Sequence, residues 1–132
     1  MKVATQFEWI SIGVVAVEEG MLRFPVAPEE PGIYQFYFGQ SVYIGETDRL
    51  RRRFQHYRTP GPSQHTNIRL RARILAHIDG GGTVMVSIAT HATVIVDSTE
   101  SNLDFSRKAS RLMVESAALT SAHLLGIPVE NL

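Results

Sequence analysis

The pattern of hydrophobic and polar positions predicts a β-hairpin in the middle of the chain. Residues 32–38 (GIYQFYF) and 41–46 (SVYIGE) are rich in the aromatic and β-branched side chains that strands favour. The glycine-led dipeptide between them suits a two-residue turn. Residues 84–89 (VMVSIA) form a third run of this kind, and residues 94–96 (VIV) are expected to extend the same sheet.

A two-residue turn fixes which side chains of the hairpin share a face. Phe38 then pairs with Ser41, and Tyr34 lies opposite Gly45. Tyr34 and Tyr43 become diagonal neighbours on one face, about 7 to 8 Å apart at Cα. Because strand side chains alternate, the other face carries a second apolar set that we expect to face the core: Ile33, Tyr37, Val42 and Ile44.

Three segments have the apolar spacing of helices. We expect helices at about residues 49–58, 65–78 and 103–125, with Thr47 or Asp48 capping the first. Gly126 and Pro128 follow the third segment and are typical of a helix end. The buried face of that last helix is predicted to contain Ala109, Leu112, Met113, Ala117 and Leu124.

The first 30 residues are expected to form an extension. Residues 7–17 and 21–24 are predicted to pair as a hairpin, and the proline-rich residues 25–31 are unsuited to a helix or a central strand. We therefore divide the chain into an N-terminal extension, residues 1–30, and one domain, residues 31–132. That domain is predicted to be α+β, with a small three-stranded mixed or antiparallel sheet flanked by helices.

The composition is that of a globular protein, with 44% hydrophobic and 20% charged residues. No apolar run approaches the roughly 18 to 20 residues that cross a bilayer, and the N-terminal sequence lacks the apolar stretch of a secretory signal. The chain has no cysteine, which excludes disulfides, thiolate metal sites and a cysteine nucleophile. These features predict a cytoplasmic protein without a membrane partner.

The formal net charge is zero, but the positive charge is concentrated in one segment. Residues 49–73 contain eight arginines and no acidic residue. Contact with a nucleic-acid backbone explains such a patch better than a solvated surface does, and it predicts binding that weakens steeply with salt. The predicted nucleic-acid-binding arginines other than Arg53 are Arg49, Arg51, Arg52, Arg58, Arg69, Arg71 and Arg73.

Two tripeptides bracket the hairpin turn, GIY at residues 32–34 and YIG at residues 43–45. With them the chain resembles the GIY-YIG nuclease family over about residues 31–131. In that family an arginine follows the YIG tyrosine by ten residues, a glutamate lies on a later helix, and an asparagine lies near the end of the domain. The matching residues here are Arg53, Glu115 and Asn131.

The resemblance implies an endonuclease that hydrolyses a phosphodiester bond of nucleic acid, with DNA as the expected form. It also implies one divalent cation, Mg²⁺ or Mn²⁺, held by Glu115. Tyr34 would orient or deprotonate the attacking water, which requires cations to lower its pKa. Tyr43 would hold the phosphate or the water network, and Arg53 would stabilise the charge of the transition state. Members of the family act in DNA repair, in restriction and as homing endonucleases.

Further positions are carried over with the motif. Tyr57 stands where members have histidine or tyrosine, and His56 is one residue out of that register. His65 resembles a histidine that contacts phosphate in some members. Gly32 and Gly45 are the structural glycines, and Gly45 is expected to leave space for a phosphate beside the Tyr34 ring. The predicted catalytic set is Tyr34, Tyr43, Arg53, Tyr57, Glu115 and Asn131.

One departure from the family pattern keeps other functions open. Many members have lysine directly after YIG, whereas this chain has Glu46, which would repel a phosphate or add a metal ligand. Glu115 also has a structural alternative, an ion pair with Arg111 one helical turn away. The alternatives to an endonuclease are a catalytically weak or inactive nucleic-acid-binding module of the same fold, and a partner-binding protein. Either target specificity would come from residues 1–30, a homodimer or a partner protein, or the cleavage would be relaxed.

Overall fold

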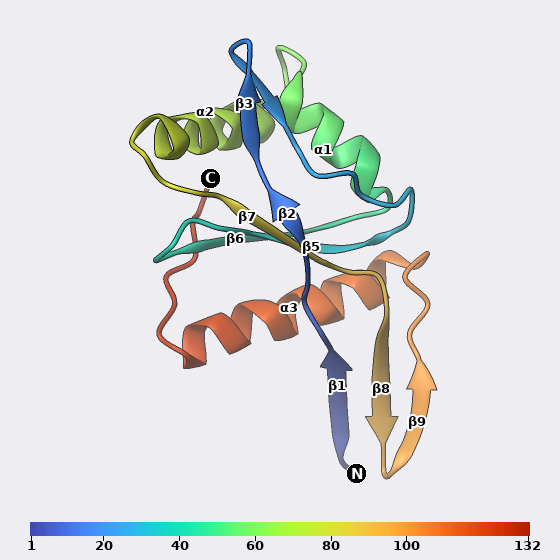
Figure 1. The fold of residues 1–132 in the computed structure, drawn as a ribbon. Helices are drawn as coiled ribbons and strands as arrows, with labels where there is room; N and C mark the ends of the chain where they lie inside the picture. Colours follow the sequence, from blue (N-terminus) through green and yellow to red (C-terminus); the bar gives the residue numbers. More distant parts are fainter.

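The computed structural model describes residues 1–132 and shows an α+β fold with three helices and three antiparallel sheets. Two helices cover one face of a central four-stranded sheet and the third covers the other (Figure 1). No helix combines the length and the apolar character that a bilayer crossing requires. The helices are α1 (Leu50–Arg58), α2 (His65–Asp79) and α3 (Lys108–Leu124). The strands are β1 (Val3–Phe7), β2 (Ile10–Val14), β3 (Ala16–Glu18), β4 (Met21–Arg23), β5 (Gly32–Tyr37), β6 (Val42–Thr47), β7 (Met85–Ala89), β8 (Ala92–Val96) and β9 (Thr99–Asn102).

The central sheet has the strand order β2-β7-β5-β6, and all of its pairs are antiparallel. The β5–β6 hairpin has the predicted register, because the Phe38 N–H donates to Ser41 O at 2.8 Å and Tyr34 pairs with Gly45. β6 is an edge strand of this sheet. Residues 128–130 run beside the start of β6 and form hydrogen bonds with Val42.

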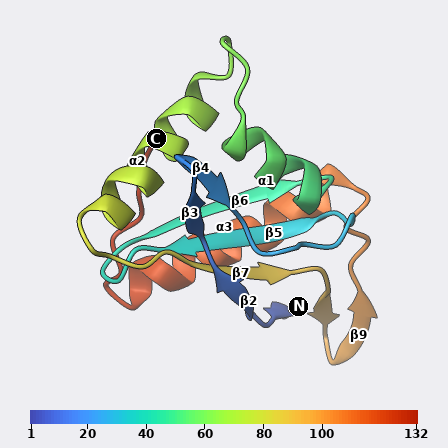
Figure 2. The same ribbon diagram turned by 45° about the horizontal axis from the view of Figure 1, so that its top comes forward.

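The two faces of the central sheet bury separate cores, because successive strand residues point to opposite sides. Figure 2 shows α1 and α2 over one face and α3 behind the other. The core under α1 and α2 is aromatic and includes Tyr34, Phe36, Phe54, Tyr57, Leu70 and Ile74. The core over α3 is aliphatic and includes Ile33, Val42, Ile44, Val114, Ala118 and Ala122.

The predicted sheet was incomplete at its edges. It has four strands rather than three, because β2 pairs with β7. Of the expected N-terminal hairpin, only β3 and β4 pair with each other. The prediction that residues 94–96 extend the central sheet was wrong, since β8 pairs with β1 and β9 in a separate sheet beyond α3 (Figure 1). Short apolar runs indicate strands but not their partners, which lie far apart in the sequence.

The helices lie close to their predicted residue ranges, but the cap of α1 differs from the prediction. α2 ends within one residue of its predicted bound. α1 begins as expected, but neither predicted cap residue caps it, because the N-cap position is held by Arg49 without a side-chain hydrogen bond. Thr47 Oγ1 instead accepts a hydrogen bond from the Arg49 N–H and donates one to Arg49 O, each at 3.2 Å.

The buried face of α3 differs from the predicted one. The helix begins at Lys108, and its buried residues are Arg111, Val114, Ala118 and Ala122. The predicted core residues Leu112, Met113 and Leu124 are 42%, 44% and 78% exposed. Small side chains let a helix approach a sheet closely, so two alanines face the sheet here and larger apolar residues remain outside.

Candidate active site

Three tyrosines meet between β5, β6 and α1. Tyr34 and Tyr57 are only 2% and 1% exposed, and their hydroxyl groups form a close hydrogen bond. The half-buried Tyr43 ring lies 6.4 Å from the Tyr34 ring between centroids, as the hairpin register predicted. The Phe54 ring packs edge-on against Tyr34 at 5.6 Å between centroids. Packing on several sides therefore fixes where the Tyr34 hydroxyl lies.

Two glycines allow the strands to approach their neighbours this closely. A Cβ at Gly45 would overlap the Tyr34 phenol. A Cβ at Gly32 would lie 2.6 Å from Ala89 O on β7. The space beside Gly45, which we expected to receive a phosphate, is thus filled by the Tyr34 ring itself.

Burial favours the neutral form of the Tyr34 and Tyr57 phenols. Burial raises the pKa of Tyr34 well above that of a free phenol, and Tyr43 raises it further. The positive charge of Arg53 and the hydrogen bond with Tyr57 lower the pKa of Tyr34 without cancelling the effect of burial. Burial likewise raises the pKa of Tyr57. Tyr34 therefore requires a further positive charge nearby before it can act as a base.

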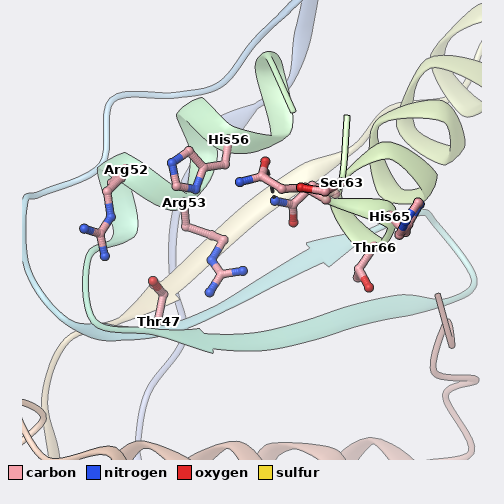
Figure 3. Close-up of a pocket in the computed structure, with 9 residues that line it drawn as sticks. Thr47, Arg52, Arg53, His56, Ser63, His65 and Thr66 are labelled. Atoms are coloured by element: carbon pink, nitrogen blue, oxygen red, sulfur yellow. Dashed lines mark hydrogen bonds between the residues drawn. The ribbon is translucent and has the colours of Figure 1, made fainter. Parts of the chain in front are cut away.

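Arg53 is the cation of the cluster. It lies four residues before Tyr57, so both side chains project from the same face of α1. Its half-buried guanidinium forms no ion pair, whereas the neighbouring Arg51 and Arg52 pair with Glu29 and Asp48. Figure 3 shows the Arg53 side chain pointing from α1 toward the sheet. A half-buried guanidinium without a carboxylate partner is free to bind an anion.

The negative charge of Glu46, on β6, acts on Glu115 of α3. Burial raises the pKa of Glu115 above that of an ordinary glutamate, and the negative charge of Glu46 raises it further. Glu46 accepts a hydrogen bond of 2.7 Å from Arg111 Nε, in an ion pair whose side chains are 16% and 8% exposed. Arg111 also donates to two backbone carbonyl oxygens before α3. The negative charge that follows the YIG tripeptide is therefore paired within the protein, and Arg111 is not the partner of Glu115.

The surroundings of Glu115 fit a bound cation. A partly buried carboxylate beside a second carboxylate is disfavoured in its charged form, and a divalent ion offsets both effects. No group of three or more histidine, aspartate or glutamate side chains forms a complete ligand set. Waters and substrate oxygens would have to fill most of the coordination shell, which is the arrangement that Mg²⁺ prefers.

A polar cleft opens between α1 and the start of α2 (Figure 3). Its volume is about 520 Å³, and no hydrophobic side chain lines it. Arg53 lines the cleft and also acts on the tyrosines, so the cleft adjoins the tyrosine cluster. The lining residues are Thr47, Arg52, Arg53, His56, Ser63, Gln64, His65, Thr66 and Asn67.

The predicted arginine patch is divided between two helices. At α1, Arg49 and Arg58 are exposed and have no ion pair, whereas Arg51 Nε donates to Ala27 O at 2.8 Å. Arg52 faces the cleft and also pairs with Asp48.

The arginines of α2 have more contacts within the chain. Arg73 pairs with Glu130, and its guanidinium lies 4.3 Å from the centre of the Phe38 ring. Arg69 donates to Leu132 O at 3.3 Å, and Arg71 Nε is buried without a hydrogen-bond partner. These contacts give two of the three arginines a structural role, so their binding of nucleic acid stays a prediction.

The remaining predicted residues lie in different places. His65 is the first residue of α2 and lines the cleft. Tyr57, which we favoured over His56, is buried behind Arg53, whereas His56 lines the open cleft. Asn131 is exposed on the C-terminal segment, and its side chain forms no hydrogen bond that would join it to the tyrosines.

Sequence reasoning missed part of the cleft and the Arg111 ion pair. The run PSQHTN at residues 62–67 is polar and free of acidic residues, which was a signal for an anion-binding wall. Arg111 and Glu46 are 65 positions apart in the sequence, and no local pattern relates them.

Comparison with known proteins agrees with the fold. No protein-family model and no curated protein matches the sequence. In structure the chain is similar to a glutamate-to-alanine mutant of bacteriophage T4 EndoII, with a TM-score of 0.61 and 18% sequence identity. The match covers 94% of this chain and 92% of the EndoII chain. EndoII is a GIY-YIG family endonuclease, so the chain has a GIY-YIG nuclease-like fold.

The extent of this match changes one expectation. The sequence resemblance was confined to about residues 31–131, but a match over 94% of the chain extends into the first 30 residues. Part of the N-terminal segment therefore belongs to the structure that the two proteins share.

Proposed function

We propose that the protein is a divalent-metal-dependent endonuclease that hydrolyses a phosphodiester bond of nucleic acid, with DNA as the expected substrate. The similarity of fold supports a nuclease in general terms. The finer proposal depends on one observation: an unpaired Arg53 adjoins two buried, hydrogen-bonded phenols and a polar cleft. These are the groups that binding and attack of one phosphate require.

Arg53 would bind the scissile phosphate. Its planar guanidinium presents parallel N–H groups that match two phosphate oxygens and stabilise the charge that grows on them in the transition state. The half-burial of Arg53 strengthens this interaction, because fewer water molecules screen it. Loss of one such donor typically lowers kcat by about 10² to 10³.

Tyr34 would hold the attacking water and accept its proton. Its hydroxyl is fixed by the hydrogen bond with Tyr57, and the charge of Arg53 favours the phenolate that must form first. Tyr43, which is only half-buried, can reach the phosphate or the water from the solvent side. The water oxygen then attacks phosphorus in line with the leaving oxygen, and the proton of the water passes to Tyr34. The bond between phosphorus and the leaving oxygen breaks, and the leaving oxygen takes up a proton from solvent.

Glu115 would hold the divalent cation, and Glu46 is the nearest second carboxylate. When bound there, Mg²⁺ or Mn²⁺ supplies positive charge that polarises the phosphate and lowers the pKa of neighbouring groups. Arg111 keeps the charge of Glu46 paired, so that the phosphate meets less repulsion than the sequence suggested.

A binding module of the same fold is the second candidate. The observation in its favour is the neutral state of Tyr34, since burial raises its pKa although Arg53 lies close by. Such a protein would use the arginines and the cleft to hold nucleic acid without cleaving it.

Incubation with supercoiled plasmid in Mg²⁺ or Mn²⁺ distinguishes the two candidates. We expect nicking by the native protein and its loss, by about 10² or more, in Arg53→Ala and Glu115→Ala. Matched controls are Arg23→Ala and Glu100→Ala, which remove the same charges from exposed side chains that do not line the cleft. Plasmid binding without cleavage in either metal would favour the binding module, and failure to bind or cleave would contradict both.

A further inference from the structure

The cleft between α1 and α2 is larger than the binding of one phosphate requires. Its volume of about 520 Å³ falls within the range of about 300 to 1,000 Å³ that is typical of pockets for small-molecule ligands. Arg53, at its inner side, is the group already proposed to bind the scissile phosphate. The rest of the cleft extends from Arg53 toward the start of α2 (Figure 3).

The lining of the cleft suits an anion. Arg52, Arg53, His56 and His65 line it, and none of its nine lining residues is acidic or hydrophobic. The closest acidic partner of this set is Asp48, which is exposed and pairs with Arg52 at 2.8 Å. Arg53, by contrast, forms no ion pair, although the negative charge of Glu46 acts on it.

The start of α2 adds backbone donors to the same wall. The helix has 15 residues and no side-chain cap, and its first internal hydrogen bond runs from Ile68 N–H to Gln64 O. The N–H groups of His65, Thr66 and Asn67 therefore have no helical acceptor, and the helix dipole is positive at this end. The hydroxyl groups of Ser63 and Thr66 lie along the same side.

Hydrogen bonds fix this wall in place before any ligand arrives. Gln64 Oε1 accepts hydrogen bonds from Gly61 N–H at 2.9 Å and from Asn67 Nδ2 at 3.2 Å. Asn67 is buried, at 7% exposure. Because both bonds go to the carbonyl oxygen of Gln64, its amide NH₂ group remains free to donate.

We propose that this cleft binds a second phosphate of the substrate, the one next to the scissile phosphate on the same strand. The proposal rests on the endonuclease function, since it takes Arg53 as the group that the two phosphates share. His56 approaches the second phosphate from α1, and His65, Thr66 and the free N–H groups approach it from α2. The ligand class is a phosphodiester-linked strand, as the endonuclease function requires.

Thr66→Glu tests the proposal without endangering the fold. Thr66 is exposed in the first turn of α2, where the helix dipole favours a carboxylate, so the stability should be unchanged or slightly higher. Thr120→Glu on the exposed side of α3 adds the same charge elsewhere and is the matched control. Binding is measured by fluorescence anisotropy with a labelled duplex in metal-free buffer, over a series of salt concentrations.

We expect Thr66→Glu to weaken duplex binding about tenfold and to reduce the salt dependence by about one phosphate contact. Thr120→Glu should bind like the native protein. Equal affinities for the two variants would overturn the second-phosphate site. Native protein that binds no duplex at all would overturn it as well.

Chemical shifts of the native protein locate the site independently. In ¹H–¹⁵N spectra, inorganic phosphate should shift the backbone amides of residues 63–67, and the double variant His56→Ala/His65→Ala should lose most of this response. Shifts confined to other regions would contradict the proposal.

These measurements do not require cleavage, so they separate this site from the endonuclease function. If the native protein cleaves, Thr66→Glu should raise KM more than it lowers kcat, whereas Glu115→Ala should abolish kcat. If the native protein binds but never cleaves, the endonuclease fails while the anisotropy and the shifts still decide the second-phosphate site.

Discussion

Tyr57 acts on the site through its hydroxyl group alone. It is buried and does not line the cleft, and its hydroxyl group is engaged by the Tyr34 hydroxyl. Its hydrogen bond with Tyr34 orients the Tyr34 hydroxyl and lowers the pKa of that phenol. Tyr57 is therefore a positioning residue, and a histidine or a tyrosine could supply the same bond.

Tyr57→Phe should separate this hydrogen bond from ring packing. The pKa of Tyr34 should rise further, and kcat should fall about tenfold with little change in KM, since one hydrogen bond contributes about 0.5 to 1.5 kcal/mol. The rising limb of the pH–rate profile should move to higher pH, because less phenolate is present at any given pH.

Tyr37→Phe is the matched control for that variant. Tyr37 is exposed and donates to Gly39 O within the hairpin turn at 2.5 Å. Loss of the Tyr37 hydroxyl group should leave the pH–rate profile unchanged. An identical shift in both variants would contradict the role of Tyr57.

Glu115 should give metal binding an unusual pH dependence. Burial raises its pKa, and Glu46 raises it further, so the carboxylate takes up a proton above the usual pH of a glutamate. Affinity for Mn²⁺, measured by calorimetry, should therefore fall as the pH decreases through this raised pKa. Glu46→Gln should lower the pKa of Glu115 and move the loss of affinity to lower pH.

As the pH falls, the free energy of unfolding should change in the opposite direction to the Mn²⁺ affinity. Because the folded-state pKa of Glu115 lies above its unfolded value, the ionised group disfavours the fold at higher pH, and that penalty disappears as the pH falls through the folded pKa.

The metal-binding prediction has its own contradicting outcome. If the Mn²⁺ affinity falls at the pH of an ordinary glutamate in both the native protein and Glu46→Gln, the two carboxylates are not coupled.

At the scale of elements, α3 is joined to the central sheet by an ion pair as well as by apolar packing. Arg111 is a buried residue of α3, and it pairs with Glu46 of the edge strand β6. Its remaining hydrogen bonds go to backbone carbonyl groups before the helix. The pair thus holds Glu46 and positions α3, which carries Glu115 one turn further on.

Arg111→Met should lower the free energy of unfolding by about 3 to 5 kcal/mol, because it leaves Glu46 partly buried without a partner. The double variant Arg111→Met/Glu46→Gln should recover most of that loss. Urea denaturation of the single and double variants measures both values.

Arg52→Met is a matched control at an exposed pair. Arg52 and Asp48 are 47% and 60% exposed in their side chains, so the loss should be below about 1 kcal/mol. If Arg111→Met lowers the free energy of unfolding no more than Arg52→Met does, the Arg111–Glu46 ion pair does not hold α3 to the sheet.

At the scale of the whole molecule, the first 30 residues share the core of the rest. β2 is a strand of the central sheet, and Val15, Leu22 and Ala27 belong to the same buried cluster as Tyr34. The division of the chain at residue 30 stays a prediction, but these contacts favour one cooperative unit.

Removal of residues 1–30 should therefore abolish cooperative unfolding of the remainder, because it removes a strand and three core side chains. Removal of residues 1–7 takes away β1 alone, which belongs to the separate sheet with β8 and β9, and should be far less damaging. Circular dichroism during thermal unfolding compares the two deletions. A cooperative transition in residues 31–132 would show that the domain boundary is real.

Local patterns predicted the hairpin, its register and the position of α2. Alternation over six residues and a two-residue turn leave few registers open, and the structure has the predicted one. The same register placed Tyr34 beside Tyr43, so two of the three tyrosines of the cluster were brought together by spacing alone.

What the sequence determined by itself is the β5–β6 hairpin, the strand β7, the approximate positions of the three helices and the family motif, because these depend on neighbours within a few turns of chain. Only the tertiary structure decided the pairing of β2, the buried face of α3, the Arg111–Glu46 ion pair and the cleft. Each of these joins residues that are far apart in sequence, and the contacts between them depend on packing that no local pattern records.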